Sequence, residues 1–84
     1  MTHDEFKLQT RTFAKQANAA RLCGDSIHSI EISVEIAKLT LAHPEFWPDD
    51  YDPPDWLKIQ CERTIREGEA ALDINRRVTA MRAL

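Results

Sequence analysis

An all-α fold made of three long helices is predicted by the spacing of apolar residues and by the positions of glycine and proline. Apolar side chains recur every three or four residues along most of the 84-residue chain, as they do on one face of an α-helix. The chain has only 2 Gly and 4 Pro, which stand between the periodic segments or within the last one. A chain of this length is expected to form one helical domain over residues 1–84. Because 10 of its hydrophobic residues are Ala, the core is expected to be small.

The first helix is predicted over residues 3–23. Thr2 and Glu5 have the spacing of a capping box, in which each side chain accepts a hydrogen bond from the other residue's backbone N–H. Gly24 suits the position after the helix because glycine readily adopts a positive φ. Between these signals, one stripe of the helix is expected to face the core: Phe6, Thr10, Phe13, Ala17 and Ala20.

The second helix is predicted over residues 25–42, with Asp25 as its N-cap. Residues 29–36 also alternate between β-branched and polar side chains, which is typical of a strand. No other segment alternates in this way, so a strand here would have no partner in the chain, and we expect a helix. Its first apolar stripe contains Ile27, Ile30, Val34, Ala37 and Leu41.

A second apolar stripe lies on the opposite side of this helix. At 100° per residue, Ile32, Ile36 and Leu39 fall roughly opposite the first stripe. A helix that is apolar on two sides needs cover on both. Either the other two helices supply it, or one stripe faces another subunit.

Prolines separate the second and third helices. His43-Pro44 ends the second helix, and the three prolines that follow predict a long loop over residues 43–54. The third helix is predicted over residues 53–82, because Pro53 suits a first helical position and no proline follows Pro54.

The apolar stripe of the third helix changes face near Gly68. Leu57, Cys61, Ile65, Gly68 and Leu72 share one side, whereas a second set lies about 100° round the axis: Ala71, Ile74, Val78 and Met81. Either the helix kinks or restarts near Gly68, which would give four helices, or its last turns leave the core and pack on a partner subunit. We therefore predict an antiparallel bundle completed by homo-oligomerisation. Its expected interface comprises Ile32, Ile36, Leu39, Ile74, Val78 and Met81.

The segment 43–56 is the most distinctive part of the sequence. It contains four of the six aromatic residues and five of the fourteen acidic ones. One interpretation is a lid on the helix ends. The other is a binding surface, because aromatic side chains dominate many interfaces and carboxylates select a basic partner. We expect a non-enzymatic protein-binding module, an adaptor or an inhibitor of a larger protein or nucleic-acid-handling machine, that binds through Glu45, Phe46, Trp47, Asp49, Asp50, Tyr51, Asp52 and Trp56.

Basic residues support an alternative hypothesis, an oligomeric nucleotide- or nucleic-acid-binding protein. Lys7, Arg11 and Lys15 form a row on the outer face of the first helix, which is also typical of a solvated face. Arg76 and Arg77 would join them, although they also suit the C-terminal end of a helix dipole. The net charge of −3 argues against a general nucleic-acid binder.

No pattern in the chain predicts catalysis, a cofactor or a metal site. Cys23 and Cys61 stand far apart, and no His or Cys pair has the CxxC or HxxxH spacing of a metal site. No apolar segment reaches the length of a membrane span, and the N-terminus is acidic where a secretory signal is basic. We expect a cytoplasmic protein that does not bind membranes.

Overall fold

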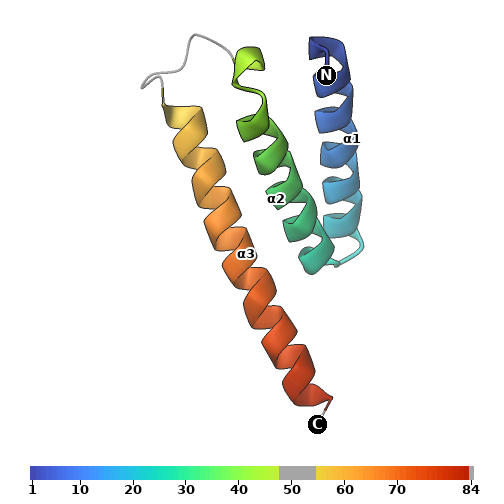
Figure 1. The fold of residues 1–84 in the computed structure, drawn as a ribbon. Helices are drawn as coiled ribbons and strands as arrows, with labels where there is room; N and C mark the ends of the chain where they lie inside the picture. The colour runs from blue at the N-terminus through green and yellow to red at the C-terminus, as the bar shows by residue number, and fades with distance from the viewer. Residues whose placement is uncertain (48–54, 84) are drawn as a thin grey trace.

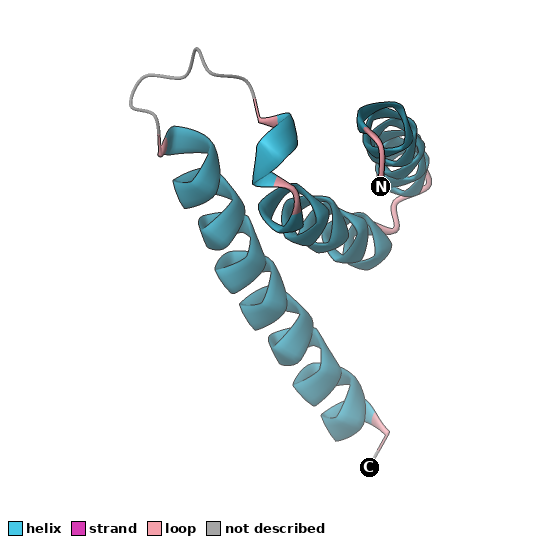
Figure 2. Ribbon diagram, turned by 45° about the horizontal axis from the view of Figure 1, so that its top comes forward, coloured by secondary structure: helices cyan, strands magenta, loops and turns pink. Residues whose placement is uncertain are grey.

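The computed structural model describes residues 1–47 and 55–83 of the chain. These residues form α1 (His3–Leu22), α2 (Ser26–Ala42), a short 3-10 helix η1 (Pro44–Phe46) and α3 (Trp56–Arg82), and they contain no strand. The predicted all-α fold is confirmed, and the alternating segment 29–36 lies within α2. Both views place α2 between α1 and α3, with consecutive helices running in opposite directions (Figure 1, Figure 2).

Local signals define both ends of α1. The Thr2 hydroxyl accepts a hydrogen bond from the Glu5 backbone N–H at 3.2 Å, and the Glu5 carboxylate accepts one from the Thr2 N–H at 3.4 Å. This is the capping box predicted from the sequence. The helix ends at Leu22, and Gly24 follows with a φ of 79°. That conformation is accessible to glycine without steric cost, so Gly24 turns the chain directly into α2.

The central helix α2 is covered on two sides by its neighbours in the same chain. Its first stripe faces α3, since Gly68 of α3 lies against Ile30 and Val34. Ile32, on the opposite stripe, is only 5% exposed and lines the same groove as Phe13 of α1. Of the two arrangements that the sequence left open for α2, the structure shows cover from α1 and α3.

The third helix runs without interruption through Gly68, so the kink or restart considered from the sequence does not occur (Figure 1). The glycine has a different role. A Cβ atom at this position would overlap Cγ2 of Val34 and lie 3.5 Å from Cγ2 of Ile30. Gly68 therefore allows α3 to approach α2 more closely than any side chain would permit.

The C-terminal half of α3 extends past the other helices. Its 27 residues span about 40 Å at 1.5 Å per residue, and the longest dimension of the molecule is 50 Å. Figure 1 shows this half continuing beyond the turn that joins α1 to α2. The core of the described residues is correspondingly small. Its buried members are Ala20, Ile32, Val34, Ala37 and Cys61.

Candidate functional site

The beginning of the acidic segment folds back onto the ends of α1 and α2. The ring of Phe46 stacks on His3 with centroids 5.1 Å apart and an interplanar angle of 6°. It also lies 5.2 Å from the ring of Phe6 and 5.6 Å from that of His43. We call these four residues the aromatic cluster. The cluster joins the N-terminal end of α1 to the C-terminal end of α2, with η1 packed between them.

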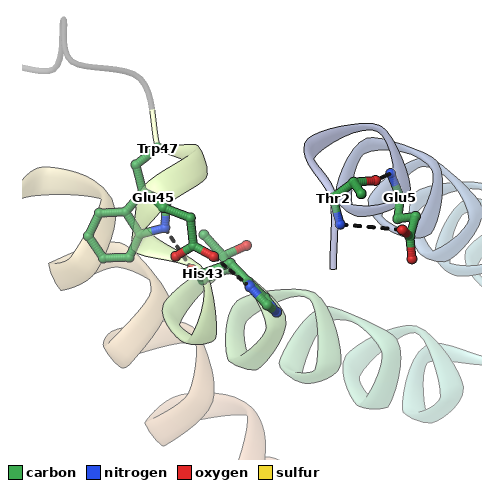
Figure 3. A network of polar contacts seen from close by, with 6 residues as sticks. Thr2, Glu5, His43, Glu45 and Trp47 are labelled. Carbon is green, nitrogen blue, oxygen red and sulfur yellow. Dashed lines mark hydrogen bonds and ion pairs between the residues drawn. The ribbon is translucent and has the colours of Figure 1, made fainter.

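Trp47 extends this packing by closing the end of α2. Its indole Nε1–H donates a hydrogen bond to the carbonyl oxygen of Thr40 at 2.6 Å (Figure 3). The last carbonyls of a helix have no hydrogen-bond donor within the helix. The Thr40 carbonyl therefore accepts hydrogen bonds from Trp47 and from the His43 N–H, the latter at 3.3 Å. Phe46 and Trp47, both predicted to bind a partner, are thus half-buried against the ends of α1 and α2.

Glu45 is the exposed polar residue of this turn. Its carboxylate lies 2.9 Å from Nδ1 of His43 (Figure 3). The hydrogen bond from this histidine lowers the pKa of Glu45 below its ordinary value. Glu45 therefore keeps its negative charge beside the aromatic cluster.

The other predicted partner-binding residues divide between the second end of the segment and the part that the structure leaves undescribed. Trp56 opens α3 and is 42% exposed. Asp55, which precedes it, is exposed. The remaining four predictions fall outside the described residues: Asp49, Asp50, Tyr51 and Asp52.

The predicted basic residues are not brought together within one chain. Lys7, Arg11 and Lys15 are exposed on α1, whereas the two arginines lie on α3, on the other side of α2. Arg77 forms an ion pair with Asp73, with Nη2 and Oδ2 separated by 3.1 Å. The positive charges thus form two separate groups on the two outer helices.

A charged groove that the sequence analysis did not anticipate lies across the remaining face of α2. It has a volume of about 580 Å³ and is walled by Phe13 and Gln16 of α1 and by part of α3. The ion pair between Lys38 Nζ and Glu69 Oε1, 3.1 Å apart, links α2 to the α3 wall. The signal for the groove was present in the sequence, because its floor repeats at intervals of three and four: His28, Glu31, Glu35 and Lys38.

The residues predicted to form an oligomer interface fall into two groups. Those of α2 are covered within the chain: Ile32 is buried, and Ile36 and Leu39 are half-buried. Those of α3 are exposed on the extended half of the helix, at 60% for Ile74, 40% for Val78 and 72% for Met81. Ile59, 53% exposed near the start of α3, belongs with them and was not predicted, because it precedes the change of apolar stripe at Gly68.

The two cysteines differ in their exposure. Cys61 is buried against α2, and this burial raises the pKa of its thiol, which disfavours the nucleophilic thiolate. Cys23 is exposed at the end of α1. The same residues contain no group of three or more His, Cys, Asp and Glu that could hold a metal ion. They also include no helix with the length and apolar character needed to cross a membrane.

Comparison with known proteins found no similarity: no family model, no curated protein and no solved structure matches the chain.

Proposed function

We propose that the protein is a non-enzymatic protein-binding module that uses the acidic aromatic segment from Glu45 to Trp56. The observation that carries this proposal is the fixed start of the segment. Phe46 packs in the aromatic cluster, and Trp47 is hydrogen-bonded to Thr40. Fixing one end of a binding segment reduces the conformational entropy lost when a partner is bound, which favours binding.

The charge of the segment specifies the chemistry of the partner. Residues 45–56 contain five carboxylates and no Lys or Arg. Such a segment attracts a basic surface and repels acidic ones. A protein whose basic surface handles nucleic acid fits this description, since the carboxylates would compete with phosphates for the same Lys and Arg side chains. The module would then act as an adaptor or an inhibitor of that protein.

The test replaces Asp49, Asp50 and Asp52 together by Asn. A partner captured with the native chain is purified, and its affinity for both forms is measured over a range of salt concentrations. We expect the variant to bind at least tenfold more weakly and with a smaller salt dependence, because three attractive charges are lost. A matched control removes three carboxylates elsewhere, from Glu31, Glu35 and Glu69 of the groove, and leaves the affinity unchanged.

Two results would contradict the proposal. The first is equal affinity and equal salt dependence of the native chain and the Asn variant. The second is salt-sensitive binding of a labelled oligonucleotide that disappears when Lys7 and Arg11 are changed to Glu. That result would support the alternative hypothesis of a nucleic-acid-binding protein.

A further inference from the structure

An apolar stripe runs along the length of α3 on a side that α2 does not cover. Its large side chains are between 40% and 72% exposed: Ile59, Ile74, Val78 and Met81. At 100° per residue they fall within an arc of about 100°, centred roughly 120° from Gly68, which faces α2. Trp56, 42% exposed, lies on the same stripe. This pattern is that of a helix with two packing faces, of which the chain itself fills one.

The stripe is apolar near both ends and charged in the middle. Arg63 and Glu67 occupy its centre, where Nε and Oε1 form an ion pair at 2.9 Å. A parallel pair of α3 helices in register would place each of these charges against its own copy, which is unfavourable. An antiparallel pair related by a two-fold axis avoids this, because it places the start of each helix against the end of the other.

We propose that the stripe binds the same stripe of a second copy of this chain, with the two α3 helices antiparallel. In this register Trp56 of one copy faces Met81 of the other near the centre line of the stripe, while Ile59 and Val78 lie at its two edges. Ile74 lies over the aliphatic part of Arg63, whose charged end reaches solvent. The apolar ends of each helix are thus covered by the apolar ends of its partner.

The charges beside the stripe are complementary in the same register. Glu62, Arg66, Asp73 and Arg77 are exposed and lie on one flank of α3, within about 60° of one another. In the antiparallel pair, Arg66 is offset from the other copy's Asp73 by two residues, or about 3 Å, and Glu62 is offset by the same amount from both Arg77 and Asp73. Attractive pairs therefore outnumber repulsive ones, which favours this register.

The size of the stripe also fits a dimer. Each of the four large side chains contributes on the order of 100 Å² of apolar surface. Two copies then bury about 800 Å², and the charged flanks raise the total to about 1,000 Å², the lower limit for a biological interface. This inference goes beyond the proposed function, because the dimer does not involve the acidic segment.

The first test measures the mass of the full chain by light scattering over a range of concentrations. We expect a dimer for the native chain, and at least ~100-fold weaker association for Ile74→Glu, because the dimer would bury a charge without a partner. Leu8→Glu is the matched control, since Leu8 is 67% exposed on α1, and it should remain dimeric. Circular dichroism checks that both variants keep their helices.

A monomeric native chain, an Ile74→Glu variant that remains dimeric, or a Leu8→Glu variant that dissociates equally would each overturn the proposal.

The second test reads the orientation of the helices directly. Arg63→Cys and Ile74→Cys, two positions that face each other near the centre line of the stripe, are made separately in a Cys23→Ser background, in which the buried Cys61 is retained. We expect oxidation to give a covalent dimer only when the two variants are mixed, with one copy of each, because Cβ atoms must lie within about 4.5 Å to form a disulfide. Covalent dimers from either variant alone would show a parallel pair, and a mixture that stays monomeric would show no pairing of these faces.

Discussion

The two ends of the molecule differ in how far their apolar side chains are buried. At one end, the aromatic cluster joins α1, α2 and η1, and Trp47 closes the last turn of α2. At the other end, α3 continues alone, and Ile74 and Met81 are 60% and 72% exposed. The difference follows from chain length, because α3 is longer than the helices beside it. The packed end supports the fold of one chain, whereas the open end contributes surface for association.

The largest expected effect is a difference in how much a substitution at each end lowers the free energy of unfolding. Replacing Phe46 with Ala should lower the free energy of unfolding by about 2 kcal/mol, since a half-buried ring loses its contacts with three other rings. Met81→Ala, at the open end, should change it by less than about 0.5 kcal/mol in a monomeric background such as Ile74→Glu. Urea unfolding measures both. Equal losses would show that the ends do not differ in this way.

Gly68 lies against Ile30 and Val34 of α2, and it tests how close the two helices must be. Alanine gains about 1 kcal/mol in helix propensity, but its Cβ overlaps Val34 Cγ2. We expect a net destabilisation of about 1–2 kcal/mol in thermal unfolding. In a Val34→Ala background the same change should cost less, because the overlapping methyl groups are absent. A stabilising Gly68→Ala in the native background would show that the close approach is unnecessary.

A smaller effect is expected at the end of α2. Trp47→Phe keeps an aromatic ring but loses the 2.6 Å hydrogen bond to the Thr40 carbonyl. The expected loss of stability is about 1 kcal/mol, measured by denaturant unfolding. An unchanged stability would contradict the capping role of Trp47.

The smallest effect concerns the pH dependence of the packed end. The hydrogen bond from His43 lowers the pKa of Glu45 from 4.5, so this pair stabilises the fold above pH 4.5. The contribution is lost as the pH falls through the lower pKa of the folded state. Glu45→Gln should therefore be less stable than the native chain at neutral pH and equally stable in strong acid. In a His43→Gln background the difference should become smaller, because the largest cause of the lowered pKa is removed, and an unchanged difference would contradict the role of His43.

Local signals in the sequence predicted the N-terminal caps of α1 and α2, because these caps depend on neighbouring residues. Thr2 and Glu5 form the predicted capping box, and Asp25 accepts a hydrogen bond from the His28 N–H at 3.1 Å. The role of Gly68 could not be obtained in this way. A glycine within a helical pattern indicates either a break or a close contact, and only the position of Val34 on another helix distinguishes them.

The candidate surfaces were predictable to different degrees. The exposure of Ile74 and Met81 followed from the change of stripe, but Ile59 was not assigned to the same face. The positions of Phe46 and Trp47 were left open between a lid and a binding surface. Their partners, His3 and Thr40, lie on separate helices, so the choice depended on how those helices pack.

The order of the helices has a consequence for how the chain reaches this structure. Packing joins α1 to α2 and α2 to α3, which are consecutive in the sequence (Figure 1). Folds built from such local contacts require little loop closure and fold quickly. The stacking of His3 on Phe46 is the exception, because these two residues are far apart in the sequence and lie at the open end of the α1–α2 hairpin. We therefore expect the helical hairpins to form rapidly. The aromatic cluster should form late and fix the register of α1 against α2.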